Sequence, residues 1–126
     1  YEIEHIWSQK YEYYKNDFPN EDDFLDKRQS IGALILVPRG ENQSYGDKHY
    51  EEKVEHYSKG NILAQSLTKI CYQSNPSFIR FMKDYNLPFE PYDTFNLYSL
   101  NKRNQLYKEI SNLIWNKDKI EYEMNN

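Results

Sequence analysis

Three polar residues in the first third of the chain are of types that could act together on a water molecule. Glu4 and His5 are adjacent, and Asn42 lies in a polar loop that follows an apolar segment. An imidazole with an ordinary pKa of about 6.5 can accept a proton at neutral pH. Carboxylate and amide oxygens are hard ligands that suit Mg²⁺. The residue types therefore predict a site in which His5 activates water beside a divalent cation.

Two short strands are expected to position these residues. Alternating β-formers and charges predict a strand over residues 1–6, and the apolar run 31–37 predicts a second strand that is buried on both faces. We expect the two strands to pair antiparallel, because this brings residue 5 close to residue 42. Adjacent side chains on a strand point to opposite faces, so Glu4 and His5 share a site only if the strand ends or bends there.

A helix is expected after the polar loop, with Asp47 as its N-cap and its end near Lys59. One set of residues recurs at the spacing of a core-facing helix stripe: Tyr50, Val54 and Tyr57. A second set has the same spacing about a quarter-turn away: His49, Lys53 and His56. Such a stripe is most often a solvated face, and a phosphate contact is the alternative interpretation.

The rest of the chain predicts an acidic insertion and a helical C-terminal half. The polar segment of about 8–30 separates the two strands and is expected to hold a short helix over 21–28. Asn75-Pro76 predicts a helix start, and apolar periodicity predicts a last helix over about 101–116. Its apolar residues are expected to be buried against Phe78, Ile79 and Met82: Leu106, Ile110, Leu113, Ile114 and Trp115.

Composition limits the classes of protein that fit. The 126 residues suit one domain, and 16 Lys+Arg against 20 Asp+Glu give a net charge of −4, which excludes a strongly basic nucleic-acid coat. No apolar run approaches about 18 residues, which excludes a transmembrane helix and predicts no membrane partner. The single Cys71 cannot form an intrachain disulfide, which favours a cytoplasmic location. The start at Tyr1, without Met or a signal sequence, suggests an excised domain of a longer protein.

The order of the motifs resembles the HNH-type C-terminal nuclease domain of GmrSD-like restriction proteins, also described as a His-Me finger or ββα-metal fold. The first half carries the resemblance in Glu4-His5-Ile6, Ile31-Gly32-Ala33-Leu34, Asn42 and Tyr50-Glu51-Glu52-Lys53. The second half carries it in Cys71-Tyr72, Asn75-Pro76-Ser77-Phe78, Leu87-Pro88-Phe89 and Ile114-Trp115. The resemblance implies an α+β fold: residues 1–60 as a ββα-metal core with the acidic insertion, and residues 61–126 as a helical subdomain packed on it.

The resemblance also implies roles for individual residues. His5 corresponds to the general base that activates the attacking water, and Glu4 and Asn42 correspond to the ligands of Mg²⁺ or another divalent cation such as Mn²⁺. The expected phosphate or DNA contacts are Lys53, Arg39, Lys48 and His49. Ala33 and Ser8 depart from the family, which often has Asn in a Gly-Asn-Leu triplet and a proline after the His-Ile motif. Both positions normally brace the loop.

The function implied is metal-dependent DNA endonuclease activity in a restriction or phage-defence protein. The expected partners are DNA, which can be modified, and an N-terminal ParB/sulfiredoxin-like NTPase or recognition domain outside this chain. The acidic balance argues against tight DNA binding by this chain alone unless the acidic insertion points away from the groove. The alternative is a catalytically degenerate HNH fold that acts as a DNA-binding or domain-docking module, with Ala33 and Ser8 as signs of decay.

Overall fold

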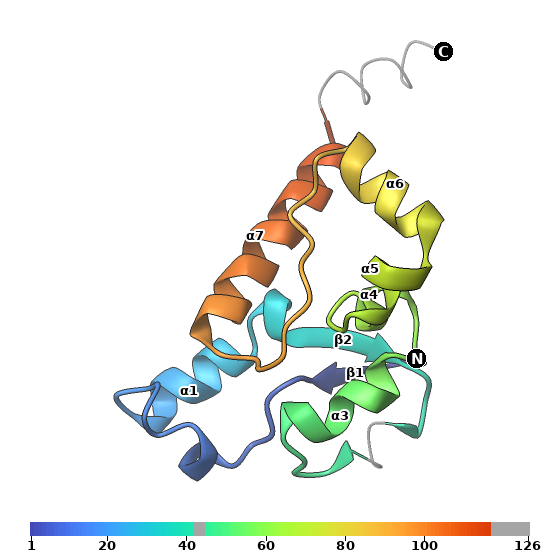
Figure 1. Ribbon diagram of the computed structural model, residues 1–126. Coiled ribbons are helices and arrows are strands. Elements are labelled where there is room, and N and C mark those ends of the chain that lie inside the picture. Colours follow the sequence, from blue (N-terminus) through green and yellow to red (C-terminus); the bar gives the residue numbers. More distant parts are fainter. Residues whose placement is uncertain (42–44, 117–126) are drawn as a thin grey trace.

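The computed structural model describes residues 1–41 and 45–116, and its centre is a small antiparallel sheet (Figure 1). Strand β1 (Glu2–His5) pairs with strand β2 (Leu34–Val37) in the register that places His5 opposite Leu34. The antiparallel pairing confirms the prediction. Strand β1 ends at His5. The strand must end or bend at this point if Glu4 and His5 are to serve one site.

Helices make up most of the remaining described structure, and the fold is mixed, as expected for the α+β class. The helical elements are η1 (Tyr11–Tyr13), α1 (Glu21–Arg28), η2 (Ile31–Ala33), α3 (Tyr50–Tyr57), α4 (Ile62–Gln65), α5 (Ile70–Ser74), α6 (Pro76–Asp84) and α7 (Leu97–Ile114). Figure 1 shows α3 beside the two strands and the long α7 running past η2. In the described part of the chain, no helix has both the length and the apolar character that crossing a membrane requires.

The second strand is shorter and more exposed than the apolar run 31–37 predicts. The first three residues of this run form the 3₁₀ turn η2 instead of strand, and this turn packs against α7. Ile31 is 62% exposed and Leu36 is 55% exposed, so the prediction of a strand buried on both faces is wrong. The two-stranded sheet packs one face on the core, and Leu36 points away from it.

The core is built from aromatic side chains that come from both halves of the chain. Trp7 lies at its centre, in edge contact with Phe18 and Phe95 and close to Phe24. The Trp7 indole nitrogen donates to the Phe95 carbonyl at 2.7 Å. Phe18 and Phe24 come from the acidic insertion, so this segment is part of the core as well as a connection between strands.

The helix after the polar loop begins at Tyr50, two residues later than an Asp47 cap predicts. His49 is the N-cap residue, and its backbone N–H donates to the Glu52 carboxylate at 3.1 Å. The expected core contact of this helix is confirmed for Tyr50 and Tyr57, which are buried. Val54 is half-buried and packs against the same core.

In the helical C-terminal half, the structure agrees best with the sequence-based prediction at the helix caps. The Asn75 side chain accepts from the Phe78 backbone, and Pro76 opens α6, as predicted. Helix α7 begins at Leu97, earlier than predicted, because the Asn96 side chain caps it through Ser99.

The burial expected along α7 holds only toward its middle. Leu106 is buried, but Ile114 is 49% exposed and Trp115 is 70% exposed. The prediction of a stripe that is mostly buried to the end of the helix is therefore wrong. The main contact of α7 is with η2, where Gly32 donates to the Asn104 side chain at 2.7 Å, and the last turn of α7 extends beyond this contact.

Candidate functional site

A cleft of about 260 Å³ opens where strand β1 ends. Three segments form its wall: the end of β1 and the residues after it, the last turn of α1, and the turn before α3. The lining residues are Glu4, His5, Trp7, Ser8, Gln9, Arg28, Gly46 and Asp47. The cleft therefore contains an imidazole, a guanidinium and two carboxylates within one hollow.

The His5 ring is half-buried and is held by the residue after α1. Its Nε2 atom lies 3.1 Å from the Gln29 side-chain oxygen. Because that oxygen can only accept, Nε2 carries the hydrogen in this arrangement and Nδ1 is left as the basic nitrogen. Burial lowers the pKa of His5, and the charges of Arg28 and Lys53 lower it further, while the Gln29 contact opposes them. These influences favour a neutral imidazole, the form that accepts a proton.

Glu4 lies at the inner end of the cleft, against α3, and is 3% exposed. The Lys53 ammonium lies 3.4 Å from one carboxylate oxygen, and the Tyr57 hydroxyl donates to the other. Burial raises the pKa of Glu4, because desolvation penalises the charged carboxylate, and the charge of Lys53 partly offsets this rise. The carboxylate is therefore held in a closed network with two partners from the same helix.

Lys53 is buried, although the sequence resemblance predicts that it contacts phosphate or DNA. Its side chain is 1% exposed, and its ammonium donates to the backbone carbonyls of His5 at 3.0 Å and Ile6 at 3.1 Å. These carbonyls lie where the chain leaves the sheet, so they lack strand partners and need a donor. The solvated stripe expected on this helix is thus interrupted by a buried lysine that binds the end of β1.

Arg28 and Gln29 are site residues that the sequence interpretation missed. Arg28 is 8% exposed and lines the cleft, and its Nε atom donates to the Trp7 carbonyl at 2.8 Å. No spacing signal links these residues to His5, because Gln29 lies 24 positions further along the chain. The basic end of the predicted 21–28 helix was the only visible sign. The insertion does not simply point away from the site, because its last helical turn forms part of the cleft wall.

The other predicted contacts, Arg39, Lys48 and His49, are not among the residues that line this cleft. Arg39 is exposed beyond the end of β2, at the opposite end of the strand pair from His5. His49 is exposed and stacks near Tyr13, with ring centroids 4.1 Å apart, and Lys48 is partly buried in the turn before α3. Asn42, the second predicted metal ligand, lies outside the described residues. The structure therefore brings Glu4 and His5 together in the cleft wall, of which Arg39, Lys48 and His49 are not part.

The described residues do not by themselves form a metal centre. Within residues 1–41 and 45–116, no group of three or more His, Cys, Asp or Glu side chains is arranged to hold an ion. Both Glu4 oxygens already have partners, and a divalent cation with its usual ligand distances of about 2.0–2.1 Å would have to displace Lys53. The contacts of Glu4 therefore do not fit a bound Mg²⁺ as they stand.

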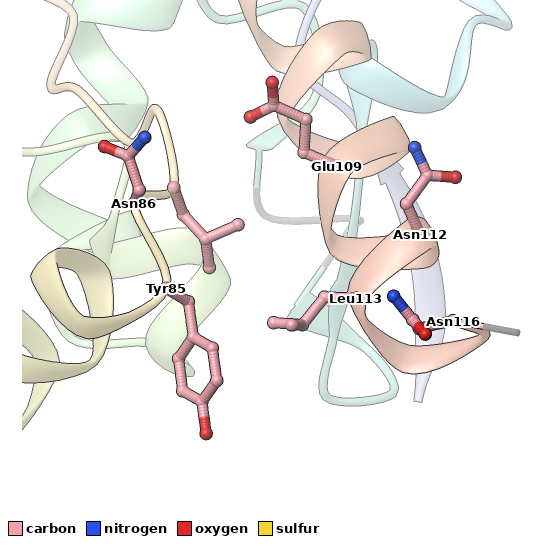
Figure 2. Close-up of a pocket in the computed structure, with 7 residues that line it drawn as sticks. Tyr85, Asn86, Glu109, Asn112, Leu113 and Asn116 are labelled. Carbon is pink, nitrogen blue, oxygen red and sulfur yellow. The ribbon is translucent and has the colours of Figure 1, made fainter. Parts of the chain in front are cut away.

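A second hollow, of about 290 Å³, lies between the chain after α6 and the last turns of α7 (Figure 2). Figure 2 shows Tyr85 and Asn86 on one side and Glu109, Asn112 and Leu113 on the other. Its described lining offers neutral amides and one carboxylate but no imidazole, lysine or arginine. It therefore lacks a base suited to neutral pH and a cation for an anionic substrate, and the cleft at His5 is the better candidate site.

Comparison with known proteins assigns the family. A half-buried histidine and a buried arginine at the end of a small sheet suit a protein that acts on an anionic substrate. The family model described as "GmrSD restriction endonucleases, C-terminal domain" matches residues 1–126, so the chain belongs to this family. The resemblance seen in the sequence is thereby confirmed. No curated protein and no solved structure matches the chain. The family indicates a function related to restriction, with nuclease activity and DNA as substrate.

Proposed function

We propose that the chain is a DNA endonuclease domain of the HNH type in which His5 is the general base. The observation that carries the proposal is the position of His5 at the end of β1, in a cleft with Arg28 and with its ring oriented by Gln29. This geometry leaves Nδ1 free to take a proton from water. Family membership supplies the substrate class, and it supports the ββα arrangement of the core.

The proposed reaction is hydrolysis of a phosphodiester. The water oxygen forms a bond to phosphorus as its proton passes to His5 Nδ1, and the P–O bond to the leaving sugar oxygen breaks, with that oxygen then taking a proton. A neutral imidazole suits this step, and burial of His5 favours that form. The reaction also requires positive charge near the phosphoryl oxygens.

We further propose that activity depends on Mg²⁺ or Mn²⁺, with Glu4 and Asn42 as ligands. The family supports a divalent metal, since restriction endonucleases generally use one. The ion would supply charge stabilisation at the phosphate when bound. Its binding would require Glu4 to give up its contact with Lys53, because the Lys53 ammonium lies 3.4 and 3.5 Å from the two carboxylate oxygens.

The same proposal covers the partners of the chain. We propose that the DNA is foreign and can be modified, and that an N-terminal NTPase or recognition domain selects it. Lys48, Arg39 and His49 stay candidates for DNA contacts outside the cleft, since all three lie at least partly in solvent. A cytoplasmic location stays a prediction of the sequence.

A second candidate function is a degenerate HNH fold that binds DNA or another domain without cleaving. The closed network of Glu4, Lys53 and Tyr57 is the observation that favours it, because it occupies the expected metal ligand. Binding without cleavage under any divalent cation would support this alternative.

The test is plasmid cleavage with and without metal. Supercoiled DNA is incubated with the protein in Mg²⁺, in Mn²⁺ and in EDTA, in parallel with His5→Ala. The proposal expects nicking by the wild type in a divalent cation only, and none by His5→Ala. Equal nicking by both proteins would contradict the assignment of His5, and an absence of nicking under every metal would favour the binding module.

A further inference from the structure

We propose that Arg28 is the phosphate-binding residue of the cleft, where its guanidinium holds a phosphodiester group of DNA beside His5. The inference rests on the proposed function for the identity of the ligand, and on the contacts of Arg28 for the site. Neither the family assignment nor the sequence pattern singles out this residue. It comes from the last turn of α1, 23 positions after His5 in the chain.

Arg28 is a buried cation whose terminal nitrogens are left for a ligand. The side chain is 8% exposed, and its Nε atom is fixed by the Trp7 carbonyl at 2.8 Å. Among the described residues, no acceptor pairs with its two terminal nitrogens and no carboxylate lies within ion-pair distance. The side chain is largely buried, but it lines the cleft, and its terminal nitrogens are not among the buried atoms without a partner, so a ligand in the cleft can reach them. An anion in the cleft would supply the missing partner.

The carboxylates around Arg28 act on it only at a distance, and among the described residues neither forms an ion pair with it. Glu4 is paired with Lys53 at 3.4 Å, and Asp47 on the rim is paired with Lys10 at 3.5 Å. With both carboxylates of the cleft engaged, the guanidinium is the positive charge that remains on its wall. An oxyanion is therefore the ligand that the electrostatics of the cleft favour.

The orientation of Arg28 suits a phosphate in particular. With Nε donated to Trp7, the two terminal nitrogens form a planar fork that can donate two parallel hydrogen bonds to phosphate oxygens. The anchor, Trp7, follows His5 by two residues, so the guanidinium and the imidazole are fixed to the same short segment. A phosphate on Arg28 would thus lie beside the base that activates water.

Binding is tested without cleavage, by titrating the protein in EDTA with a short DNA duplex that has no terminal phosphates. Arg28→Gln should weaken binding about 10- to 100-fold and reduce the slope of log K against log salt by about 0.9. Arg28→Lys keeps the charge and loses the planar fork, so its affinity for the duplex should lie between those of the wild type and Arg28→Gln. The control is Arg80→Gln, which removes the same charge from an exposed position on α6 and should leave affinity near wild type. Equal affinities for Arg28→Gln and Arg80→Gln would overturn the proposal.

A measurement on the wild type covers the case in which Arg28→Gln does not fold. The ¹⁵N signal of the Arg28 Nε–H group, assigned by its loss in Arg28→Lys, should shift and saturate as the duplex is added. An unchanged signal at saturating DNA would overturn the proposal. The claims for Arg28 and for His5 can fail separately. If Arg28→Gln loses DNA affinity but His5→Ala cleaves at the full rate, His5 is not the base, and the phosphate site at Arg28 stands. The reverse result would refute the phosphate site alone.

Discussion

The two neighbouring side chains at the end of β1, Glu4 and His5, have different environments. His5 faces the residues after α1 and keeps one ring nitrogen available, whereas Glu4 is buried under α3 with both oxygens engaged. Lys53 joins the two, because its ammonium contacts the Glu4 carboxylate and the His5 carbonyl. A lysine expected to bind phosphate therefore fixes the strand end that carries His5.

The buried pair predicts a large loss of stability when one partner is removed. Lys53→Met leaves Glu4 without its cation at a site that is 3% exposed, and we expect a loss of about 3–5 kcal/mol in the free energy of unfolding. Urea unfolding measures this loss. The double variant Lys53→Met/Glu4→Gln should recover at least about half of it, because no buried charge is then left uncompensated. A loss below about 1 kcal/mol for Lys53→Met would contradict the role of the pair.

Part of the candidate site could be predicted from the sequence. The position of Glu4 and His5 at the end of a strand follows from the alternation of β-formers and charges in residues 1–6 and from the order of the motifs. Arg28 and Gln29 could not be predicted in this way, because their approach depends on how α1 is turned by the packing of Phe24 against Trp7. The burial of Lys53 was equally hidden, since helical periodicity identifies a stripe but does not show which carbonyls lie beneath it.

At the scale of helices and strands, the sequence predicts where a helix is capped but not which distant element packs against it. Asn75-Pro76 begins a helix because the asparagine side chain satisfies a free backbone N–H, and this depends on neighbouring residues only. The apolar run 31–37 divides into a 3₁₀ turn and a strand because its first part packs against α7, which lies far away in the sequence. The exposed end of α7 has the same origin, since the contact with η2 lies along the earlier turns.

The contact between η2 and α7 makes Gly32 intolerant of a side chain. A Cβ at this position would lie 2.6 Å from the Asn104 side-chain oxygen and 2.7 Å from the Asn104 backbone nitrogen. Because backbone atoms cannot yield as a flexible side chain can, Gly32→Ala should destabilise the protein by about 2–3 kcal/mol. Urea unfolding followed by far-UV circular dichroism measures this cost.

Gly46→Ala is the matched control for that substitution. Gly46 has φ +49 and no atom within 4 Å of the added carbon, so only backbone strain of about 1–2 kcal/mol is expected. A smaller cost for Gly32→Ala than for Gly46→Ala would show that the packing of η2 on α7 is looser than described.

At the scale of the whole molecule, the acidic insertion separates its charges. Glu21 and Asp22 lie exposed in the first turn of α1, whereas Arg28 ends the same helix at the cleft. Eight residues of helix span about 12 Å, which exceeds the Debye length of about 8 Å at physiological salt. A net charge of −4 is therefore compatible with a cleft that attracts phosphate.

The shared aromatic core couples the two halves of the chain around this cleft. Trp7 follows β1, Phe24 comes from the insertion, and Phe95 precedes α7, and all three pack together. Residues 1–60 and the described part of 61–126 therefore contribute to one core. The position of the cleft wall depends on both halves, which agrees with a family model that spans the whole chain.

The central claim is that His5 is the base of a DNA-cleaving cleft, and single-turnover cleavage of a pre-bound duplex tests it most directly. His5→Gln should keep DNA affinity close to wild type while the cleavage rate falls by at least about 100-fold, because a general base contributes about 10²–10⁴ to the rate. His56→Gln, which alters an exposed histidine beside Tyr45, is the matched control and should keep both affinity and rate. A cleavage rate for His5→Gln within about threefold of wild type, which corresponds to less than about 1 kcal/mol of activation energy, would contradict the account.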